Sequence, residues 1–399
     1  MSPSSTPGFD EFLHLPPPST VDTGEVADGK VVFPPWRGAA DRPEAPTPAP
    51  LPPDERVGFA LVGLGRLTLQ QLLPAFAQCQ KARVTALVSG SPEKLQAVAR
   101  QYGITACYSY AEMELLAINA DVQCVYIVLP NAMHRVFTER AAAAGKHVLC
   151  EKPLATSSDD ARAMVAACRE AGVKLMTAYR IHYQPHNIRA RQLVADGSHG
   201  RIVAYSATNV QTCAADAADA TGQWRHKAAL AGGGALPDIG LYCLNTARFI
   251  SGEEPEEVMA WLHSPEGDPR FAEVEATVSF SLRFPSAFVA SCHCSYAGRE
   301  DKHQRINLER ATLDMPDAYS YSGQRLLIGQ RLGDDAASTE LQLAPANQFA
   351  AEIDHMAECI LEDREPRTPG EEGLRDQLLM EAIYRAARSG QPVRTDGIF

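Results

Sequence analysis

The stretch that decides the fold is Val57-Gly58-Phe59-Ala60-Leu61-Val62-Gly63-Leu64-Gly65-Arg66-Leu67-Thr68. Its first half is a continuous apolar run, as in a buried strand, and residues 69–80 have the spacing of a helix. Glycines at a turn from strand to helix let the backbone approach a pyrophosphate, whose charge meets the N–H groups of the helix N-terminus. Thr68 stands where this fingerprint has a third glycine, which weakens the match. Residues 63–67 are therefore predicted to bind a dinucleotide.

Strands and helices alternate downstream of this motif. Nearly continuous apolar runs are typical of buried strands, and most are followed by a segment with helical spacing. Predicted strands lie at 57–62, 83–88, 122–128, 147–150 and 174–177, and predicted helices at 69–80, 92–102, 134–144 and up to 170. This rhythm predicts an α/β domain at residues 56–178, with a parallel sheet covered on both faces; the family resemblance described below implies that it is a Rossmann domain.

The pattern changes near residue 200. Apolar and polar residues alternate from 273 to 284, which is typical of an antiparallel sheet with one wetter face. Further strands are predicted at 202–207, 257–262 and 287–294, and two closing helices at 347–361 and 373–388. Residues 179–399 are therefore predicted to form a second, α+β domain with a mainly antiparallel sheet.

Residues 1–55 contain 13 of the 28 prolines of the chain. Proline lacks a backbone N–H and fixes φ, so this segment should be extended. Its composition permits a disordered tail, but Phe9, Phe12 and Trp36 are too apolar for a plain linker. We interpret it as an N-terminal arm that lies along another surface.

Composition and charge argue against several classes of partner. The 399 residues carry a formal net charge of −12, and phosphate-rich surfaces attract basic proteins, so neither nucleic acid nor an anionic membrane is expected. No apolar run approaches the roughly 18–20 residues that span a bilayer. The ten cysteines form no Cys-x-x-Cys pair, and Cys292-His293-Cys294 has no second ligand pair, so no metal is expected.

The end of the second predicted strand bears on the choice of cofactor. NAD-binding versions place Asp or Glu there to hold the ribose 2′-hydroxyl. Here Ser89 and Gly90 leave room for a 2′-phosphate, and Lys94 offers positive charge one turn later. The competing acid, Glu93, is explained as a partner of the helix dipole. The sequence favours NADP over NAD.

Two further motifs are candidates for chemistry. Glu151-Lys152-Pro153 follows a strand at the carboxyl edge of the sheet, where such folds bind ligands. Residues 232–242 read Gly-Gly-Gly-Ala-Leu-Pro-Asp-Ile-Gly-Leu-Tyr. If a helix begins at Asp238, then Asp238 and Tyr242 lie four residues apart on one face.

At these residues the chain resembles the glucose–fructose oxidoreductase branch of the Gfo/Idh/MocA oxidoreductase family, from about Val57 to the C-terminus. Glu151-Lys152-Pro153 and the Gly-Gly-Gly…Asp-Ile-Gly run mark the wide family, while Ser89-Gly90, Gln223-Trp224-Arg225 and Tyr242 are more specific to this branch. Other matching segments are Tyr126–Asn131, Gly145–Val148, Tyr179–Tyr183 and Pro345–Phe349.

The resemblance implies a large open sheet in the second domain, whose exposed face makes a homodimer or homotetramer. It also implies a tightly held NADP(H), the oxidation of one sugar at C1 to its lactone, and the reduction of a second sugar to an alditol. Lys152, Asp238 and Tyr242 would be catalytic and would contact the sugar. Tyr242 would be the general base, with Lys152 beside it and Asp238 orienting the lysine or the sugar. His182 would either reach the sugar or cap a turn.

The resemblance also implies cofactor contacts outside the glycine turn. Trp224 has an alternative explanation as a packing residue. The expected contacts are Gly63, Leu64, Gly65, Arg66, Leu67, Ser89, Gly90, Lys94, Leu129, Pro130, Asn131, His134, Glu151, Lys152, Arg180, Trp224 and Arg225.

Three expectations concern the whole chain. The N-terminal arm would reach over a neighbouring subunit and hold the cofactor in place. The twin-arginine export signal of periplasmic relatives is absent from the sequence, so a cytoplasmic location is expected. The sugar–sugar oxidoreductase has two alternatives: an NADP-dependent aldose dehydrogenase with exchangeable cofactor, and a non-catalytic NADP-binding sensor. The Lys152–Asp238–Tyr242 set argues against the sensor, because binding alone does not need it.

Overall fold

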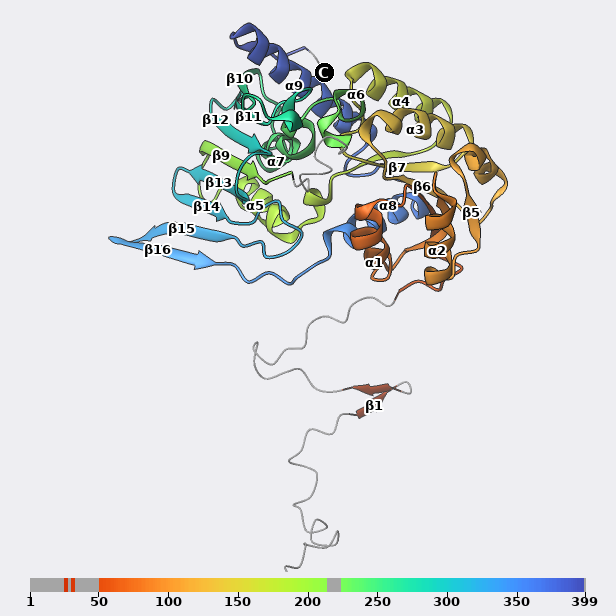
Figure 1. The fold of residues 1–399 in the computed structure, drawn as a ribbon. Coiled ribbons are helices and arrows are strands. Elements are labelled where there is room, and N and C mark those ends of the chain that lie inside the picture. The colour runs from red at the N-terminus through yellow and green to blue at the C-terminus, as the bar shows by residue number, and fades with distance from the viewer. Residues whose placement is uncertain (1–24, 28–29, 33–49, 214–223, 398–399) are drawn as a thin grey trace, which may run out of the picture. The chain divides into compact units, whose positions relative to one another are not determined.

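The structure, a computed structural model, describes residues 25–27, 30–32, 50–213 and 224–397 (Figure 1). The chain divides into two units, Met1–Ala49 and Pro50–Phe399. In the first unit, strands β1 (Glu25–Ala27) and β2 (Lys30–Val32) form an antiparallel pair. Residues 50–55 at the end of the Pro-rich arm are described with the second unit, and the rest of the arm lies outside the described residues, as does the prediction that it docks on another subunit.

The first sheet of the second unit has six parallel strands in the order β5-β4-β3-β6-β7-β8. The chain starts at β3, in the middle of the sheet, and winds first to one edge and then to the other, as in a Rossmann fold. The strands are β3 (Val57–Val62), β4 (Ala82–Val88), β5 (Ala106–Tyr108), β6 (Cys124–Ile127), β7 (His147–Glu151) and β8 (Leu175–Ala178). Strand β5 was not predicted, because three residues are too few to show a period.

Helical segments cover both faces of this sheet. They are η3 (Thr68–Leu72), α1 (Leu73–Phe76), α2 (Pro92–Tyr102), η4 (Tyr110–Ile118), η5 (Asn131–Met133), α3 (His134–Ala143) and α4 (Ser158–Glu170). The helix predicted at 69–80 is wrong in its form. It starts as a π-helical turn and ends at Phe76, and Pro74 lacks the N–H that a regular ladder needs.

The second sheet has nine strands in the order β16-β15-β14-β13-β9-β12-β11-β10-β17, and only β9 and β12 pair in parallel. The strands are β9 (Ile202–Val210), β10 (Glu257–His263), β11 (Thr277–Arg283), β12 (Val289–Ser295), β13 (Asp301–Leu308), β14 (Ala311–Met315), β15 (Leu327–Leu332), β16 (Asp335–Glu340) and β17 (Val393–Arg394). The period of two predicted β11 and β12, whereas β13 to β16 were missed.

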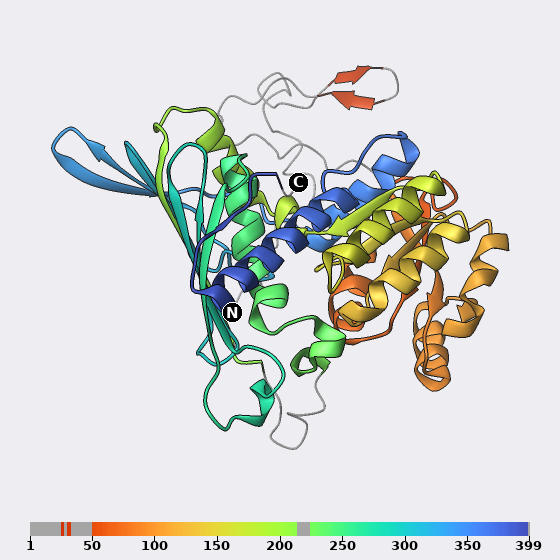
Figure 2. The same cartoon turned by 90° about the horizontal axis from the view of Figure 1, so that it is seen from above.

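Helices pack against one face of this sheet and leave the other open (Figure 2). On β11 the buried side chains Val278, Phe280 and Leu282 alternate with half-exposed Thr277, Ser279 and Ser281. The helical segments of this domain are η6 (Arg180–Tyr183), α5 (Pro185–Ala195), η7 (Trp224–His226), α6 (Ala228–Ala231), η8 (Leu236–Gly240), α7 (Leu241–Ser251), η9 (Pro269–Phe271) and α9 (Gly370–Ser389).

Helix α8 (Gln348–Leu361) returns from the second domain to the first sheet. Its buried residues Phe349, Ile353 and Met356 join the same apolar cluster as Phe59 and Leu61 of β3. The Rossmann core therefore contains a segment from far beyond residue 178, the expected end of the first domain.

The predicted fold class is confirmed: an α/β Rossmann domain is followed by an α+β domain with a large, mainly antiparallel sheet. Within the described residues, no helix combines the length and the apolar character that a membrane span requires.

Because α8 completes the Rossmann core, a cavity in α8 should destabilise the whole domain. Ile353 is fully buried, so Ile353→Ala is expected to lower the free energy of unfolding by about 2–5 kcal/mol. Leu361→Ala is the matched control, since Leu361 is 50% exposed at the end of the same helix. Denaturant unfolding measures both variants, and an equal, small effect of the two would contradict the assignment of α8 to this core.

Candidate active site

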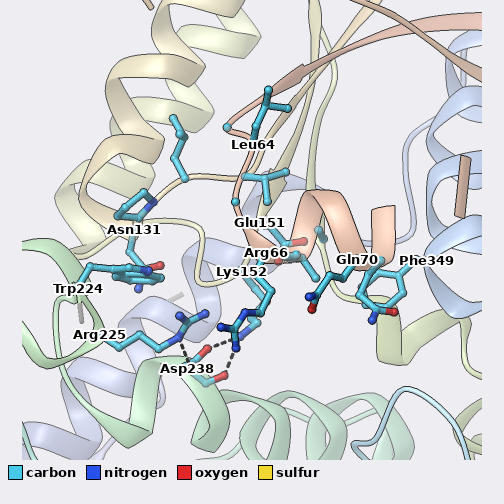
Figure 3. Close-up of a pocket in the computed structure, with 18 of the residues that line it drawn as sticks. Leu64, Arg66, Gln70, Asn131, Glu151, Lys152, Trp224, Arg225, Asp238 and Phe349 are labelled. Carbon is cyan, nitrogen blue, oxygen red and sulfur yellow. Dashed lines mark hydrogen bonds and ion pairs between the residues drawn. The ribbon is translucent and has the colours of Figure 1, made fainter. Parts of the chain in front are cut away.

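A cavity of about 990 Å³ lies where the carboxyl ends of β3, β4, β6 and β7 face η8 and the start of α7. Its walls come from both domains, so residues far apart in sequence meet there (Figure 3). Nearly all the predicted site residues line it: Gly63, Leu64, Gly65, Arg66, Leu67, Ser89, Gly90, Lys94, Leu129, Pro130, Asn131, Glu151, Lys152, Arg180, Trp224, Arg225, Asp238 and Tyr242.

The glycine turn after β3 is required by close approach of the backbone. Gly63 has φ +98°, and a Cβ there would lie 2.2 Å from the carbonyl oxygen of Val128. At Gly65 a Cβ would meet nothing within 4 Å, so the turn borders open space in the cavity. Thr68 is buried, and its hydroxyl donates to the carbonyl oxygen of Gly63 at 2.6 Å. Thr68, which departs from the fingerprint, therefore stabilises the glycine turn through this hydrogen bond.

The end of β4 borders the same cavity. Gly90 packs so closely on Tyr110 that a Cβ would come within 2.8 Å of its ring. Ser91 caps α2 by accepting from the backbone N–H of Lys94 at 3.4 Å. Ser89 and Lys94 both line the cavity.

Lys152 and Asp238 form a buried ion pair across the domain boundary. The ammonium group donates to Asp238 Oδ1 at 2.9 Å and to the Asp238 carbonyl oxygen at 2.7 Å. Arg225 Nε donates to the other carboxylate oxygen at 3.0 Å, and the hydroxyl of Tyr296 donates to it at 2.7 Å. Figure 3 shows Lys152 and Arg225 converging on Asp238.

These contacts keep both partners charged at neutral pH. Burial alone would raise the pKa of Asp238, but Lys152 and Arg225 together hold it well below its ordinary value. Burial would likewise lower the pKa of Lys152, and the Asp238 carboxylate raises it above its ordinary value instead. Lys152 therefore stays protonated near pH 7.

Tyr242, in the first turn of α7, faces this cation and a second one. The Lys152 ammonium nitrogen lies 4.8 Å from the centroid of the Tyr242 ring, and the Arg180 guanidinium carbon lies 4.7 Å from it. Asp238 and Tyr242 do not share one regular helix as expected. Asp238 lies in the π-helical turn η8, and α7 begins only at Leu241.

The Gly-Gly-Gly run that precedes η8 allows this segment to pack closely. A Cβ at Gly233 would lie 2.1 Å from the Tyr384 hydroxyl, and one at Gly234 would lie 1.9 Å from the Glu275 carbonyl oxygen. The Glu275 carboxylate accepts from the backbone N–H groups of Gly234 and Leu236 at 2.9 and 3.0 Å. These contacts hold the turn that carries Asp238.

Arg180 is held mainly by neutral acceptors. It donates to Gln348 Oε1 at 2.7 Å and to the Tyr319 carbonyl oxygen at 2.8 Å. Asn347 caps α8 by accepting from the backbone N–H groups of Phe349 and Ala350, and the Phe349 side chain lines the cavity. The Asn-Gln-Phe motif therefore provides a helix cap, a partner for Arg180 and a cavity wall.

The two predicted histidines do not line the cavity, which corrects their expected roles. His134 is fully buried, and its ring nitrogens contact the carbonyl oxygens of Leu129 at 2.9 Å and Pro153 at 3.0 Å. It joins two loops of the cavity wall from behind. His182 is 4% exposed and donates from Nε2 to Oδ1 of Asn245, a residue of the same helix as Tyr242, at 2.6 Å.

Two buried acids lie on the cavity wall beside Arg180. Glu151 accepts from the Tyr126 hydroxyl at 2.9 Å, and burial raises its pKa. Glu352 of α8 is 1% exposed, and burial together with Glu151 raises its pKa well above the ordinary value. Neither carboxyl oxygen of Glu352 has a hydrogen-bond partner among the described residues.

These observations fit a bound dinucleotide. The open space at Gly65 and the cations Arg66 and Lys94 suit phosphate groups, and the Lys152–Asp238–Tyr242 set lines the same cavity. The carboxyl group of Glu352 has hydrogen-bonding capacity that the described protein does not use. Trp224, which was expected either to contact the cofactor or to pack, lines the cavity. The guanidinium carbon of Arg225 lies 4.5 Å from the centroid of its ring.

Several cavity residues were not predicted from the sequence. The Asn-Gln-Phe motif was a signal for Phe349. Tyr296, which bonds Asp238 but does not itself line the cavity, follows an apolar strand and gave no signal. The other cavity-lining residues missed are Gln70, Gln71, Ser91, Tyr110, Val128, Ala178, Gln211, Thr212, Cys213, Ile239, Glu300, Tyr321 and Glu352.

Comparison with known proteins matches both domains. A family model described as "Oxidoreductase family, NAD-binding Rossmann fold" matches residues 57–179, and one described as "GFO/IDH/MocA C-terminal domain" matches residues 188–313. The structure of an aldose-aldose oxidoreductase from Caulobacter crescentus, complexed with glycerol, is 44% identical with a TM-score of 0.81. It covers 85% of this chain and 100% of its own.

Two curated relatives match at lower identity. The D-xylose 1-dehydrogenase [NADP(+)] of Haloarcula marismortui is 32% identical over 345 residues, covering 86% of this chain and 94% of its own. The 1,5-anhydro-D-fructose reductase of Ensifer adhaerens is 30% identical over 345 residues, covering 84% and 97%. Because the family models cover more than half of the chain, the protein belongs to the Gfo/Idh/MocA family of oxidoreductases.

Proposed function

We propose that this chain is an NADP(H)-dependent sugar oxidoreductase that oxidises an aldose at C1 to its lactone and reduces a second sugar to an alditol. The observation that carries the proposal is a single cavity that joins the glycine turn to Lys152, Asp238 and Tyr242. The similarity to an aldose-aldose oxidoreductase and to an NADP-dependent xylose dehydrogenase supports the sugar class.

The cavity residues fall into two groups, one for the phosphates of the cofactor and one for its nicotinamide half. Arg66, Ser89 and Lys94 would hold the phosphates, while Glu151, Arg180 and Trp224 would lie toward the nicotinamide half. When bound, NADP(H) supplies the hydride acceptor for one sugar and the hydride donor for the other.

Tyr242 would take the proton of the C1 hydroxyl as the hydride leaves, and would return it in the second reaction. Negative charge on its oxygen would be stabilised by the nearby charges of Lys152 and Arg180. Asp238 accepts a hydrogen bond from Lys152 on one carboxylate oxygen, which holds the lysine in place and keeps it charged. Arg225 and Tyr296 donate to the other oxygen and so keep Asp238 itself ionised and in position.

Homo-oligomerisation is part of the same proposal. The open face of the second sheet presents serine and threonine side chains of β11 together with charged side chains such as Glu257 and Arg283, and Trp261 and Val289 are exposed among them at 59% and 43%. A flat face of this kind fits a second copy of the sheet, which would cover both apolar residues.

Retention of nucleotide separates the proposal from its alternatives. Protein purified without added nucleotide should carry NADP(H) and should convert a mixture of an aldose and a second sugar into lactone and alditol in equal amounts. The measurements are the absorbance of released nucleotide and chromatography of the products. A requirement for fresh NADP⁺ at each turnover would favour the aldose dehydrogenase, and nucleotide binding without any sugar oxidation would favour the sensor.

Removal of the Tyr242 hydroxyl should stop catalysis while the cofactor still binds. Tyr242→Phe is expected to lower kcat by on the order of 10²–10⁴-fold, because the proton acceptor is lost but the ring still packs between its neighbours. Tyr102→Phe is the control, since Tyr102 is exposed on α2. Steady-state kinetics and nucleotide titration measure the two effects, and a Tyr242→Phe variant of normal kcat would remove Tyr242 from the mechanism.

Substitution of Ser89 should change the choice of nucleotide. Ser89→Asp is expected to weaken NADP⁺ binding by roughly tenfold or more, because a carboxylate repels the 2′-phosphate in a partly buried site, and to favour NAD⁺. Glu93→Gln is the control, since Glu93 lies in the first turn of α2 and does not line the cavity. Calorimetric titration with both nucleotides gives the affinities. Unchanged NADP⁺ affinity in Ser89→Asp would place the 2′-phosphate elsewhere.

A further inference from the structure

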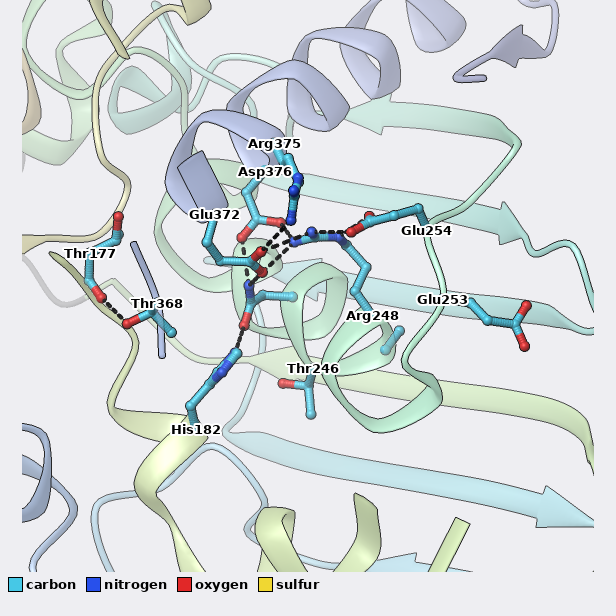
Figure 4. A network of polar contacts seen from close by, with 12 residues as sticks. Thr177, His182, Thr246, Arg248, Glu253, Glu254, Thr368, Glu372, Arg375 and Asp376 are labelled. Atoms are coloured by element: carbon cyan, nitrogen blue, oxygen red, sulfur yellow. Dashed lines mark hydrogen bonds and ion pairs between the residues drawn. The ribbon is translucent and has the colours of Figure 1, made fainter. Parts of the chain in front are cut away.

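A buried polar network joins α7 to α9 (Figure 4). Arg248 of α7 is 4% exposed and donates to three carboxylates: Glu254 at 2.6 Å, Glu372 at 2.7 Å and Asp376 at 2.5 Å. None of these residues lines the cavity, so the mechanism proposed above does not use them.

Asn245 is the point where three elements meet. Its amide nitrogen donates to Asp376 Oδ2 at 2.8 Å and to Glu372 Oε1 at 3.1 Å, both on α9. Its amide oxygen accepts from His182 Nε2 of η6 at 2.6 Å. Since Asn245 is fully buried and both ends of its amide are bonded, its orientation is fixed.

Both segments joined by the His182–Asn245 hydrogen bond, η6 and α7, also carry residues of the candidate active site. Tyr242 precedes Asn245 by three residues in α7, almost one helical turn. Arg180 precedes His182 by two residues in η6, and its guanidinium group lies 4.7 Å from the Tyr242 ring centroid. The His182–Asn245 hydrogen bond therefore joins the two segments that carry Arg180 and Tyr242.

The protonation of the network suits this arrangement. Burial lowers the pKa of His182 to about 4, so the ring is neutral near pH 7 and its one N–H is the Nε2 donor that Asn245 accepts. Burial raises the pKa of Asp376 to about 7, against the effect of Arg248 and with that of Glu372. Its Oδ2 accepts from Asn245, which orients the amide oxygen toward His182.

We propose that His182 and Asn245 are positioning residues, which set the Tyr242 ring against Arg180 through the hydrogen bond between η6 and α7. They act from behind the site and touch neither sugar nor cofactor. This inference rests on the proposed function of Tyr242, and it replaces the expected contact of His182 with the sugar. A purely structural role would affect the folded fraction but not the turnover of each folded molecule.

Two substitutions of His182 separate the hydrogen bond from the packing of the ring. The imidazole lies 4.0 Å from the Phe249 ring centroid, so His182→Phe keeps an aromatic ring there and loses the Nε2 donor. His182→Gln supplies an N–H donor without the ring. Glu254→Gln is the control, because it breaks the outer Arg248 ion pair without touching Asn245.

The first readout is kinetic. Per nucleotide-binding site, kcat of His182→Phe should fall on the order of 10–100-fold with KM little changed, as a misplacement of about 1 Å can produce. His182→Gln should recover most of kcat, and Glu254→Gln should keep it. In the Tyr242→Phe background, His182→Phe should cause no further loss, because two residues that act as one unit are not additive. Normal kcat per site in His182→Phe, or full additivity of the two changes, would overturn the proposal.

The second readout does not depend on sugar turnover. Fluorotyrosine placed at position 242 should give one sharp ¹⁹F resonance in the unmodified background and in Glu254→Gln. It should give a shifted or broadened resonance in His182→Phe, restored by His182→Gln. If the protein oxidises no sugar, the proposed function fails while this spectrum still tests the positioning role. An identical spectrum in His182→Phe would contradict the inference even if the function holds.

Discussion

Lys152 and Asp238 come from different domains, and their ion pair is withdrawn from water, so each charge depends on the other for its solvation. Removing one partner of such a pair leaves an uncompensated buried charge, which is strongly destabilising. Asp238 meets this constraint with both carboxylate oxygens occupied, by Lys152 on one side and by Arg225 and Tyr296 on the other. The pair therefore joins the two domains at the wall of the cavity.

The backbone at both walls of the cavity contains a π-helical turn in place of a regular helix. Lys152 also bonds the main-chain carbonyl of Asp238, which is reachable because η8 is a widened π-helical turn rather than a regular helix. The other π-helical stretch of the described chain, η3, begins at Thr68, whose hydroxyl fastens the glycine turn. Such irregular turns occur often at functional sites, because they direct backbone groups that a regular helix keeps for itself.

Much of this could be predicted from the sequence where the signal is local. The apolar runs with helical intervals gave the Rossmann core, and the glycine turn and Lys152–Asp238–Tyr242 gave residues that line one cavity. The residues that could not be predicted are those whose role depends on partners far away in the sequence. Tyr296 and Glu352 have no local pattern, because Asp238 and Glu151, the groups they approach, lie far away in sequence. The two explanations of His182 stayed open for the same reason, since its partner Asn245 lies 63 residues away.

The acidic balance of the chain and its anionic cofactor are compatible because they act at different scales. A net charge of −12 describes the field that a polyanion such as nucleic acid meets over a wide surface. Inside the cavity the local balance differs: Arg66, Lys94 and Arg180 are cations on its wall, and Asp238 is neutralised by its own partners. Burial raises the pKa of both Glu151 and Glu352, which lowers the cost of placing these two acids on the cavity wall. A dinucleotide in this cavity would therefore meet these cations, although the chain as a whole is acidic.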